Sequence, residues 1–184
     1  MKRIAACLMA LILLVSCMTA LADDDLETFN FGDFSMTFDA GMYGNTYDKT
    51  DGQVWFMLYP DYDASATAHP NINVVWSETV QDLTAVDPAV YAENVQEDIV
   101  TQVSGESVTI ENTSVLSAAL TELNGKTALC AHCYYEVEGY AVYMLQYVVS
   151  DEAFGSYIFT ASYNDPAQQD TMTTILDTVT WTAA

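Results

Sequence analysis

Two cysteines, Cys130 and Cys133, have the CxxC spacing that can support disulfide, redox or metal chemistry. In redox motifs this spacing works because a turn at a helix N-terminus brings the two sulfur atoms together. Here the surrounding residues alternate as in a β-strand, and positions i and i+3 of a strand point to opposite faces. We therefore expect two separate thiols in the core. A redox or structural disulfide and a metal site are the alternatives, although one CxxC pair is short of a zinc ligand set.

A second candidate ligand set lies on one face of the same predicted strand and consists of Cys130, His132, Tyr134 and Glu136. Neighbouring residues on one face of a strand are about 6–7 Å apart. A metal ion about 2 Å from each ligand would be reached by two of them, not four. We keep His132 as a weak metal candidate, and expect this face to lie under a helix near its edge, with Glu136 and Glu138 emerging into solvent.

A third candidate is the loop that contains Asp61, Asp63 and His69. Asp-x-Asp followed by small residues resembles part of a calcium loop, but the glycine and the terminal glutamate of an EF-hand are missing. We expect a solvated loop, with Asp61 and Asp63 as weak metal candidates.

Catalytic motifs are missing from the sequence. It contains no Gly-x-Ser-x-Gly and no glycine-rich phosphate loop, and neither histidine has a clear nucleophile or orienting partner. A carboxylate pair for glycoside cleavage is uninformative in a chain with 26 acidic residues. We expect no enzymatic activity and no cofactor.

The N-terminus has the pattern of a secretory signal, which predicts export. Residues Lys2 and Arg3 precede the apolar run Ile4–Val15, and Ala20-Leu21-Ala22 forms a small-x-small cleavage site. Cleavage after Ala22 would leave a single domain over residues 23–184. The alternative is the lipobox-like Leu14–Cys17, in which Cys17 would carry a lipid anchor, the only membrane attachment we expect.

Charge excludes several partner classes. All acidic residues follow the cleavage site, and only Lys49 and Lys126 remain as basic residues beyond it. Nucleic acid is excluded because backbone binding needs clustered lysine and arginine, and phosphorylated ligands and anionic lipid headgroups are disfavoured. The acidity favours solubility outside the cell, or attraction of divalent cations or of a basic partner.

The predicted centre of the fold is Leu123–Tyr163, which reads as three consecutive strands that begin at the Asn124-Gly125 turn. The middle strand, Tyr140–Ser150, is apolar on both faces, so it lies inside a sheet that is covered on both sides. An N-cap followed by proline begins a helix at Asp87-Pro88, ending at Gly105, and another at Asp165-Pro166. Other predicted strands cover Phe29–Asp39, Gln53–Tyr59, Asn71–Glu78, Ser107–Ile110 and Ser114–Glu122.

This order predicts an α+β fold of α/β/α sandwich type, with a largely antiparallel sheet and helices covering both faces. The pattern resembles the PsbP-like family, including bacterial exported and lipoprotein relatives of that photosystem extrinsic subunit. The similar strings are Phe34–Phe38, Leu123–Ala128, Tyr157–Thr160 and Ile175–Val179. The resemblance implies the same sandwich and an accessory or binding role, usually without enzymatic activity.

The sequence thus predicts an exported, non-enzymatic binding or accessory domain whose partner is a protein or a small ligand. A divalent-cation-binding acidic protein is the alternative, and a hydrolase is a third. We expect any site to lie in the loops Asp39–Asp51 and Asp61–Pro70.

Overall fold

The computed structural model describes residues 26–39, 43–46, 55–59, 70–103 and 109–182. The signal cleavage site at Ala22, the candidate lipidation site Cys17, and the loop candidates Asp61, Asp63 and His69 lie outside these ranges, as does most of the loop Asp39–Asp51. The elements in chain order are β1 (Leu26–Asn30), β2 (Phe34–Asp39), β3 (Tyr43–Thr46), β4 (Trp55–Tyr59), β5 (Asn71–Ser77), α1 (Pro88–Val103), β6 (Ile110–Leu123), β7 (Lys126–Val137), β8 (Tyr140–Asp151), β9 (Gly155–Tyr163), α2 (Gln169–Leu176) and β10 (Thr180–Trp181).

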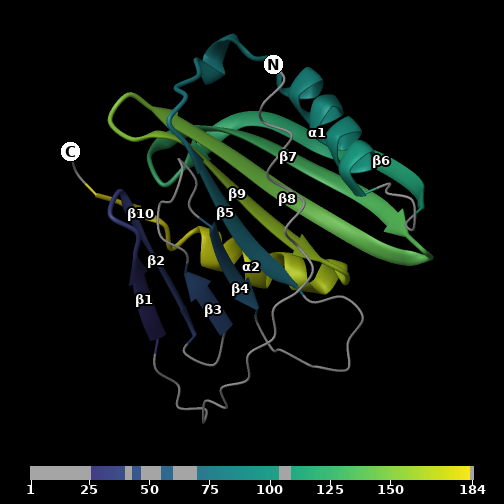
Figure 1. The fold of residues 1–184 in the computed structure, drawn as a ribbon, viewed down its shortest axis with the longest axis horizontal. Helices are drawn as coiled ribbons and strands as arrows, with labels where there is room; N and C mark the ends of the chain where they lie inside the picture. Colours follow the sequence, from purple (N-terminus) through teal and green to yellow (C-terminus); the bar gives the residue numbers. More distant parts are fainter. Residues whose placement is uncertain (1–25, 40–42, 47–54, 60–69, 104–108, 183–184) are drawn as a thin grey trace.

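A large antiparallel sheet forms the body of the molecule (Figure 1). Within the described residues its strand order is β3-β4-β5-β9-β8-β7-β6, and every neighbouring pair is antiparallel. The prediction of a largely antiparallel sheet is therefore confirmed. β8 lies between β7 and β9, as its two apolar faces predict.

Two tight turns set the register of the long strands. Asn124-Gly125 joins β6 to β7, and Glu138-Gly139 joins β7 to β8; all four residues have positive φ angles, between 48° and 83°. Two-residue turns of this kind match the twist of the strands that they join, and they fix which residues lie opposite each other. The pairs that flank the turns are Leu123 with Lys126, and Val137 with Tyr140.

One face of the sheet packs against α1. Ala92, Val95 and Ile99 of α1 form a cluster with Ala131, Cys133 and Met144 of the sheet. Asp87 caps the start of the helix, since its carboxylate accepts a hydrogen bond of 2.9 Å from the backbone N–H of Ala89. A buried polar chain also ties α1 to the sheet, because the Tyr91 hydroxyl donates to Gln146, which donates to Thr160 over 3.1 Å.

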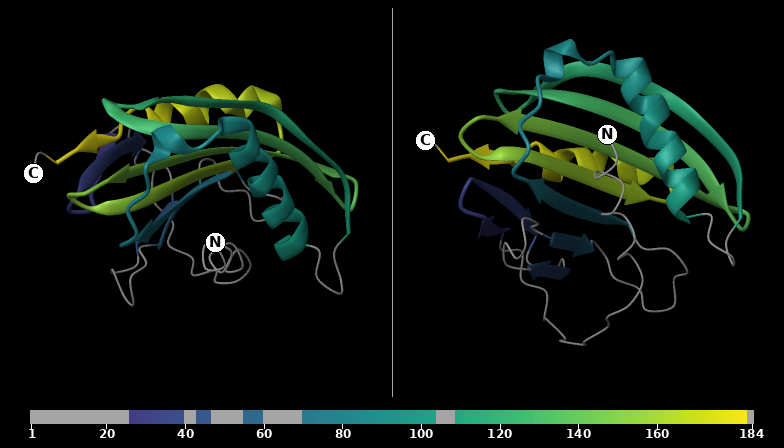
Figure 2. Two further views of the ribbon diagram at one scale, coloured as in Figure 1. Left: turned by 90° about the horizontal axis from the view of Figure 1, so that it is seen from above. Right: turned by 45° about the horizontal axis from the view of Figure 1, so that its top comes forward.

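The other face packs against a mixed layer. The helix α2 contributes Met172, Ile175 and Leu176 to the main core, and β2 contributes Phe34, Met36 and Phe38 to it. β2 belongs to a second antiparallel sheet, with the order β1-β2-β10. Figure 2 shows α1 and α2 on opposite sides of the large sheet.

The expected α/β/α sandwich with helices covering both faces is thus not confirmed. α2 has only eight residues, so it covers only part of this face of the large sheet. The small sheet covers much of the rest. The apolar alternation of Phe34, Met36 and Phe38 makes β2 one-sided, and that side closes the core. The fold is α+β with more strand than helix.

Several predicted boundaries change. The predicted strand Phe29–Asp39 is two strands, because the chain turns at Gly32, where φ is 92° and the N–H bonds to the Asn30 side chain over 2.8 Å. The two stretches predicted before Glu122 form the single strand β6. The predicted N-cap at Asp165 is confirmed, and Asp165 forms a capping box with Gln168, but the first turn, Pro166–Gln168, is a 3₁₀ turn ahead of α2.

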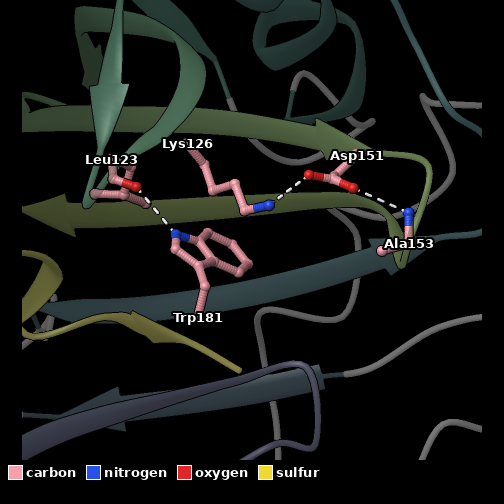
Figure 3. Close-up of polar contacts among 5 residues, drawn as sticks. All are labelled: Leu123, Lys126, Asp151, Ala153 and Trp181. Atoms are coloured by element: carbon pink, nitrogen blue, oxygen red, sulfur yellow. Dashed lines mark hydrogen bonds and ion pairs between the residues drawn. The ribbon is translucent and has the colours of Figure 1, made fainter. Parts of the chain in front are cut away.

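The C-terminal strand is held against the large sheet by an aromatic anchor (Figure 3). The Trp181 indole N–H donates to the Leu123 carbonyl over 3.0 Å, and its ring stacks on Phe154 at 5.0 Å between centroids. Beside it, the Lys126 ammonium pairs with the Asp151 carboxylate at 2.5 Å. The Trp181 contacts anchor the C-terminal strand to the large sheet. None of the described helices is long and apolar enough to cross a membrane.

Candidate functional site

The two cysteines lie on opposite faces of β7, as strand parity predicts. Cys133 packs with the α1 cluster, whereas Cys130 lies against the main core on the α2 side, and both thiols are free. Burial raises the pKa of Cys133 to about 11 and raises the pKa of Cys130 as well. Because the thiolate is the reactive form, neither cysteine is poised for redox or nucleophilic chemistry.

The α2 face of the strands carries a row of aromatic side chains that we call the tyrosine row: His132, Tyr134, Tyr143 and Tyr163. Tyr134 lies directly opposite Tyr143 on β8, and Tyr143 lies opposite Tyr163 on β9. The row therefore runs across three strands at the end of the sheet where β9 leads into the Pro166–Gln168 turn. His132, Tyr134 and Tyr143 are partly exposed, and Tyr163 is buried.

The rings of the row contact one another in sequence. Tyr143 stacks on Tyr163 with centroids 5.5 Å apart and an angle of 9° between the planes. Tyr134 is tilted against Tyr143 by 52° at 5.2 Å. The His132 Nε2 lies 2.9 Å from the Tyr163 hydroxyl, which fixes the imidazole at the inner end of the row. Tyr134 forms the outer end.

A carboxylate, Glu136, lies beside the outer end of the row. It accepts hydrogen bonds from the Tyr134 hydroxyl and from the side-chain amide of Asn112 on β6. These two donors lower the pKa of Glu136, so it is ionised at neutral pH. The same bond to Glu136 raises the pKa of Tyr134 to about 12.

The inner end of the row is neutral. Burial lowers the pKa of His132 below its ordinary value, so the imidazole is uncharged at neutral pH. Burial also raises the pKa of Tyr163 to about 12. A general base needs a pKa near the working pH and a proton to abstract, whereas these shifts leave the histidine weakly basic and the tyrosines protonated. The arrangement therefore suits binding better than catalysis.

Metal chemistry gains no support in the described part of the chain. There, no group of three or more histidine, cysteine or acidic side chains lies close enough to hold an ion. The prediction that Cys130, His132 and Glu136 lie on one face of the strand is confirmed. However, His132 is hydrogen-bonded to Tyr163, and Glu136 accepts hydrogen bonds from Tyr134 and Asn112. Glu138, expected in solvent, is exposed, and Glu136 is partly buried.

The sequence reasoning missed Tyr143, Tyr163 and Asn112 as members of this site. A signal for Tyr143 was present, because a two-residue turn at Glu138-Gly139 places Tyr134 opposite it. Tyr163 and Asn112 had no comparable signal. The β8–β9 turn is longer than two residues, so it does not fix in advance which residue lies opposite Tyr143. β6 has register shifts on both sides of Thr113, so the position of Asn112 cannot be counted from the Asn124-Gly125 turn.

Comparisons with known proteins identify the fold. No family model and no curated protein sequence matches the chain. The solution structure of cyanobacterial PsbP (CyanoP) from Synechocystis sp. PCC 6803 matches with a TM-score of 0.62 at 15% identity, over 92% of this chain and 99% of that one.

Two further structures are more distant. A protein of unknown function, PA94 from Pseudomonas aeruginosa, matches with a TM-score of 0.50 at 10% identity, over 86% of this chain and 99% of that one. LpqN, involved in cell envelope biogenesis of Mycobacterium tuberculosis, reaches a TM-score of 0.47 at 13% identity, over 86% of this chain and 91% of that one. The expected resemblance is confirmed at the level of structure: the chain has the PsbP-like fold.

Proposed function

We propose that this chain is an exported accessory domain without enzymatic activity that binds an organic cation of its partner at the tyrosine row. The observation that carries the proposal is the outer end of the row, where two partly exposed tyrosine rings, tilted at 5.2 Å, stand beside the ionised Glu136. An ammonium or guanidinium group above such rings is attracted by their negative faces. A lysine or arginine side chain of a protein and a small amine share this chemistry.

The surroundings favour a cation over other ligands. The chain carries 26 acidic residues against four basic ones, so its overall field attracts positive groups. Glu136 keeps its charge through two hydrogen bonds and still has acceptor capacity for a third donor. An anionic ligand would meet a carboxylate here, and among the described residues the only lysine or arginine, Lys126, pairs with Asp151 instead.

Support for an accessory role outside the cytoplasm comes from three directions. Residues 1–22 have the pattern of a secretory signal, and the acidic composition suits an exported protein. The fold is shared with cyanobacterial PsbP. The shifted pKa values of the row and of the cysteines leave no activated nucleophile there. These observations support our proposal that the domain acts in the extracytoplasmic space.

Binding is tested with two probes, arginine amide and tetramethylammonium, titrated into the protein and followed by NMR of the tyrosine rings. We expect shifts at Tyr134 and Tyr143. Tyr134→Ala removes a ring and abolishes the shifts at Tyr143, whereas Tyr134→Phe keeps the ring and preserves binding. Tyr140→Ala is the matched control, since Tyr140 is exposed at the hairpin tip outside the row. Binding that is absent in the wild type, or unchanged in Tyr134→Ala, overturns the proposal.

A parallel titration with calcium separates this function from the divalent-cation alternative. If the acidic chain holds Ca²⁺ specifically, millimolar calcium raises the melting temperature beyond an ionic-strength control. We expect no such excess. An excess that Glu136→Gln leaves intact would favour the alternative.

Export is tested by mass spectrometry of the mature N-terminus after expression of the full chain. We expect the mature chain to begin at Asp23, which follows Ala22. A diacylated Cys17 would instead show a lipid-anchored domain, and a retained Met1 in a cytoplasmic fraction would refute export.

A further inference from the structure

We propose that the outer edge of β6 is a docking site for an extended, basic segment of another protein, which adds to the large sheet as a further strand. This inference goes beyond the tyrosine row, because it uses the backbone of β6 and the α1 side of the sheet. The structural features that support it are the open edge of β6, the acidic residues of α1 and the Asn124-Gly125 turn that follows β6.

β6 is the last strand of the large sheet on its side, and within the described residues no strand pairs with its outer edge. In the right view of Figure 2, β6 forms the outer margin of the sheet, and α1 lies against the sheet face beside it. Unpaired strand edges present backbone donors and acceptors that another chain can pair with. Peptides bind other proteins in this way by strand addition.

The sequence of β6 lacks the usual protection of an edge. Natural edge strands are kept short, or carry lysine, proline or inward-pointing charges. β6 has 14 residues, no proline and no basic residue. Its only charged residues are Glu111 and Glu122 near the two ends, so the ten residues between them are uncharged. The edge is therefore open to pairing along most of its length.

Two irregularities limit the usable part. The pairing of β6 with β7 shifts between Ile110 and Thr113, and again between Val115 and Ser117. From Ser117 to Leu123 the pairing is continuous. A partner strand would thus pair with this regular stretch, which has the length of an ordinary strand.

The turn determines which backbone groups of that stretch are free. The residues that flank a two-residue turn, Leu123 and Lys126, form a hydrogen-bonded pair, and such pairs alternate with non-hydrogen-bonded ones. Counting back, Ala118, Leu120 and Glu122 belong to non-hydrogen-bonded pairs. Their N–H and C=O groups point away from β7 toward the open edge.

Exposed apolar side chains lie along the same edge. Leu120 is 44% exposed and Leu116 is 48% exposed, whereas the other large apolar residues of the strand, Ile110, Val115 and Leu123, are partly or fully buried. Leu120 lies opposite Leu129, so it points to the α1 side. Also next to α1, but at the Thr113 end of β6 and outside the regular stretch, lies an open groove lined by Glu93, Gln96, Glu97, Val100, Thr101 and Thr113. An added strand would bury Leu120 with its own apolar residues.

Charge selects the partner. Glu93 and Glu97 line the groove, and Glu111 and Glu122 flank the uncharged stretch of β6. Lys126 is the one lysine or arginine within the described ranges, and its ammonium is paired with Asp151. A basic segment meets complementary charge at this edge, whereas a second copy of this strongly acidic chain is repelled. We therefore commit to a basic segment of another protein.

The experiment uses a fluorescent peptide in which alternating valine and threonine are flanked by lysine pairs, titrated with the whole mature protein at low salt and followed by anisotropy. We expect saturable binding. Leu120→Pro removes an outward N–H without removing a bond to β7, so it weakens binding about tenfold. Leu120→Thr keeps that N–H and serves as the matched variant, with a smaller loss. Circular dichroism establishes that both variants are folded.

Two controls separate this edge from other binding. Both peptides are titrated into Tyr134→Ala, because lysine side chains are also the ligands proposed for the tyrosine row. The same peptide with alternate backbone amides methylated keeps its charge but cannot pair as a strand, and we expect it not to bind this variant, whereas the unmodified peptide still binds. Equal binding of both peptides, or equal affinity of Leu120→Pro and Leu120→Thr, overturns the proposal. A wild-type dimer that Leu120→Pro dissociates would show that the edge instead pairs two copies.

Discussion

Replacing Gly155 by alanine tests how tightly the turn between β8 and β9 is packed against β5. Gly155 has a φ of +90°, and a Cβ built on it would lie 2.4 Å from the Ser77 carbonyl oxygen and 3.1 Å from the Glu78 Cα. Both atoms are backbone, so neither can rotate away. Gly139, in the β7–β8 turn, has a similar φ of +80°, but a Cβ there would meet nothing within 4 Å. The pair of substitutions therefore separates backbone strain from steric contact.

The expected loss of stability combines backbone strain, a change in the freedom of the unfolded chain, and steric contact. Placing an alanine in the left-handed region costs roughly 1–2 kcal/mol, at both positions alike. Alanine also reduces the freedom of the unfolded chain, which offsets about 0.4–1 kcal/mol at both positions. At Gly155 the close contact forces a backbone shift, and overpacking of this kind costs roughly a further 1–3 kcal/mol. We expect Gly155→Ala to be the more destabilising variant by that additional amount.

The assay is urea unfolding followed by far-ultraviolet circular dichroism, with both variants and the wild type measured at one pH. Similar slopes against urea would show that the three proteins unfold from comparable native states. If Gly155→Ala and Gly139→Ala are destabilised equally, the close approach of β9 to the Ser77 carbonyl is wrong, and so is the packing argument built on it. A loss that is larger in Gly155→Ala than in Gly139→Ala by about 1–3 kcal/mol supports the argument.

Three further predictions concern buried and titrating groups. Tyr91→Phe removes the hydroxyl that donates to the buried Gln146, and we expect urea unfolding to show a loss of about 1–3 kcal/mol; no loss would mean that water replaces the hydroxyl. Cys130 and Cys133 should react slowly with a thiol reagent in the native protein at pH 7 and fast after unfolding, because burial raises the pKa of both thiols; fast native labelling of either contradicts this. Burial lowers the pKa of His132, so the unfolded state binds its proton more readily. The wild type should therefore lose stability relative to His132→Gln as the pH falls below about 6.5, and parallel stability profiles would refute this.

The long strands could be predicted from the sequence because their signals are local. Three strands, β7, β8 and β9, occupy the predicted stretch, and β8 covers Tyr140–Asp151 where the sequence predicts Tyr140–Ser150. Their alternation and the Asn124-Gly125 turn define faces and register without help from distant residues. Parity alone also separates Cys130 from Cys133, which removes a disulfide within the strand.

The covering of the sheet could not be predicted in the same way. The small sheet joins β2 to β10, with Ser35 opposite Thr180, a pairing that no local pattern announces. Nothing in the apolar alternation of Phe34, Met36 and Phe38 says whether a helix or the large sheet packs against it. The turn at Gly32 is also hidden, because Phe31 and Phe34 on its two sides are both apolar.

Both proposed surfaces depend on the register of one hairpin system. If β7 slipped by one residue against β8, Tyr134 would no longer lie opposite Tyr143 and the row would lose its outer end, since a slip moves every side chain to the other face. If β6 slipped by one residue against β7, the outward groups at Ala118 and Leu120 would turn inward. The two tight turns forbid both slips, because each joins its strands with two residues of positive φ. The turns thus position the tyrosine row and the open edge together.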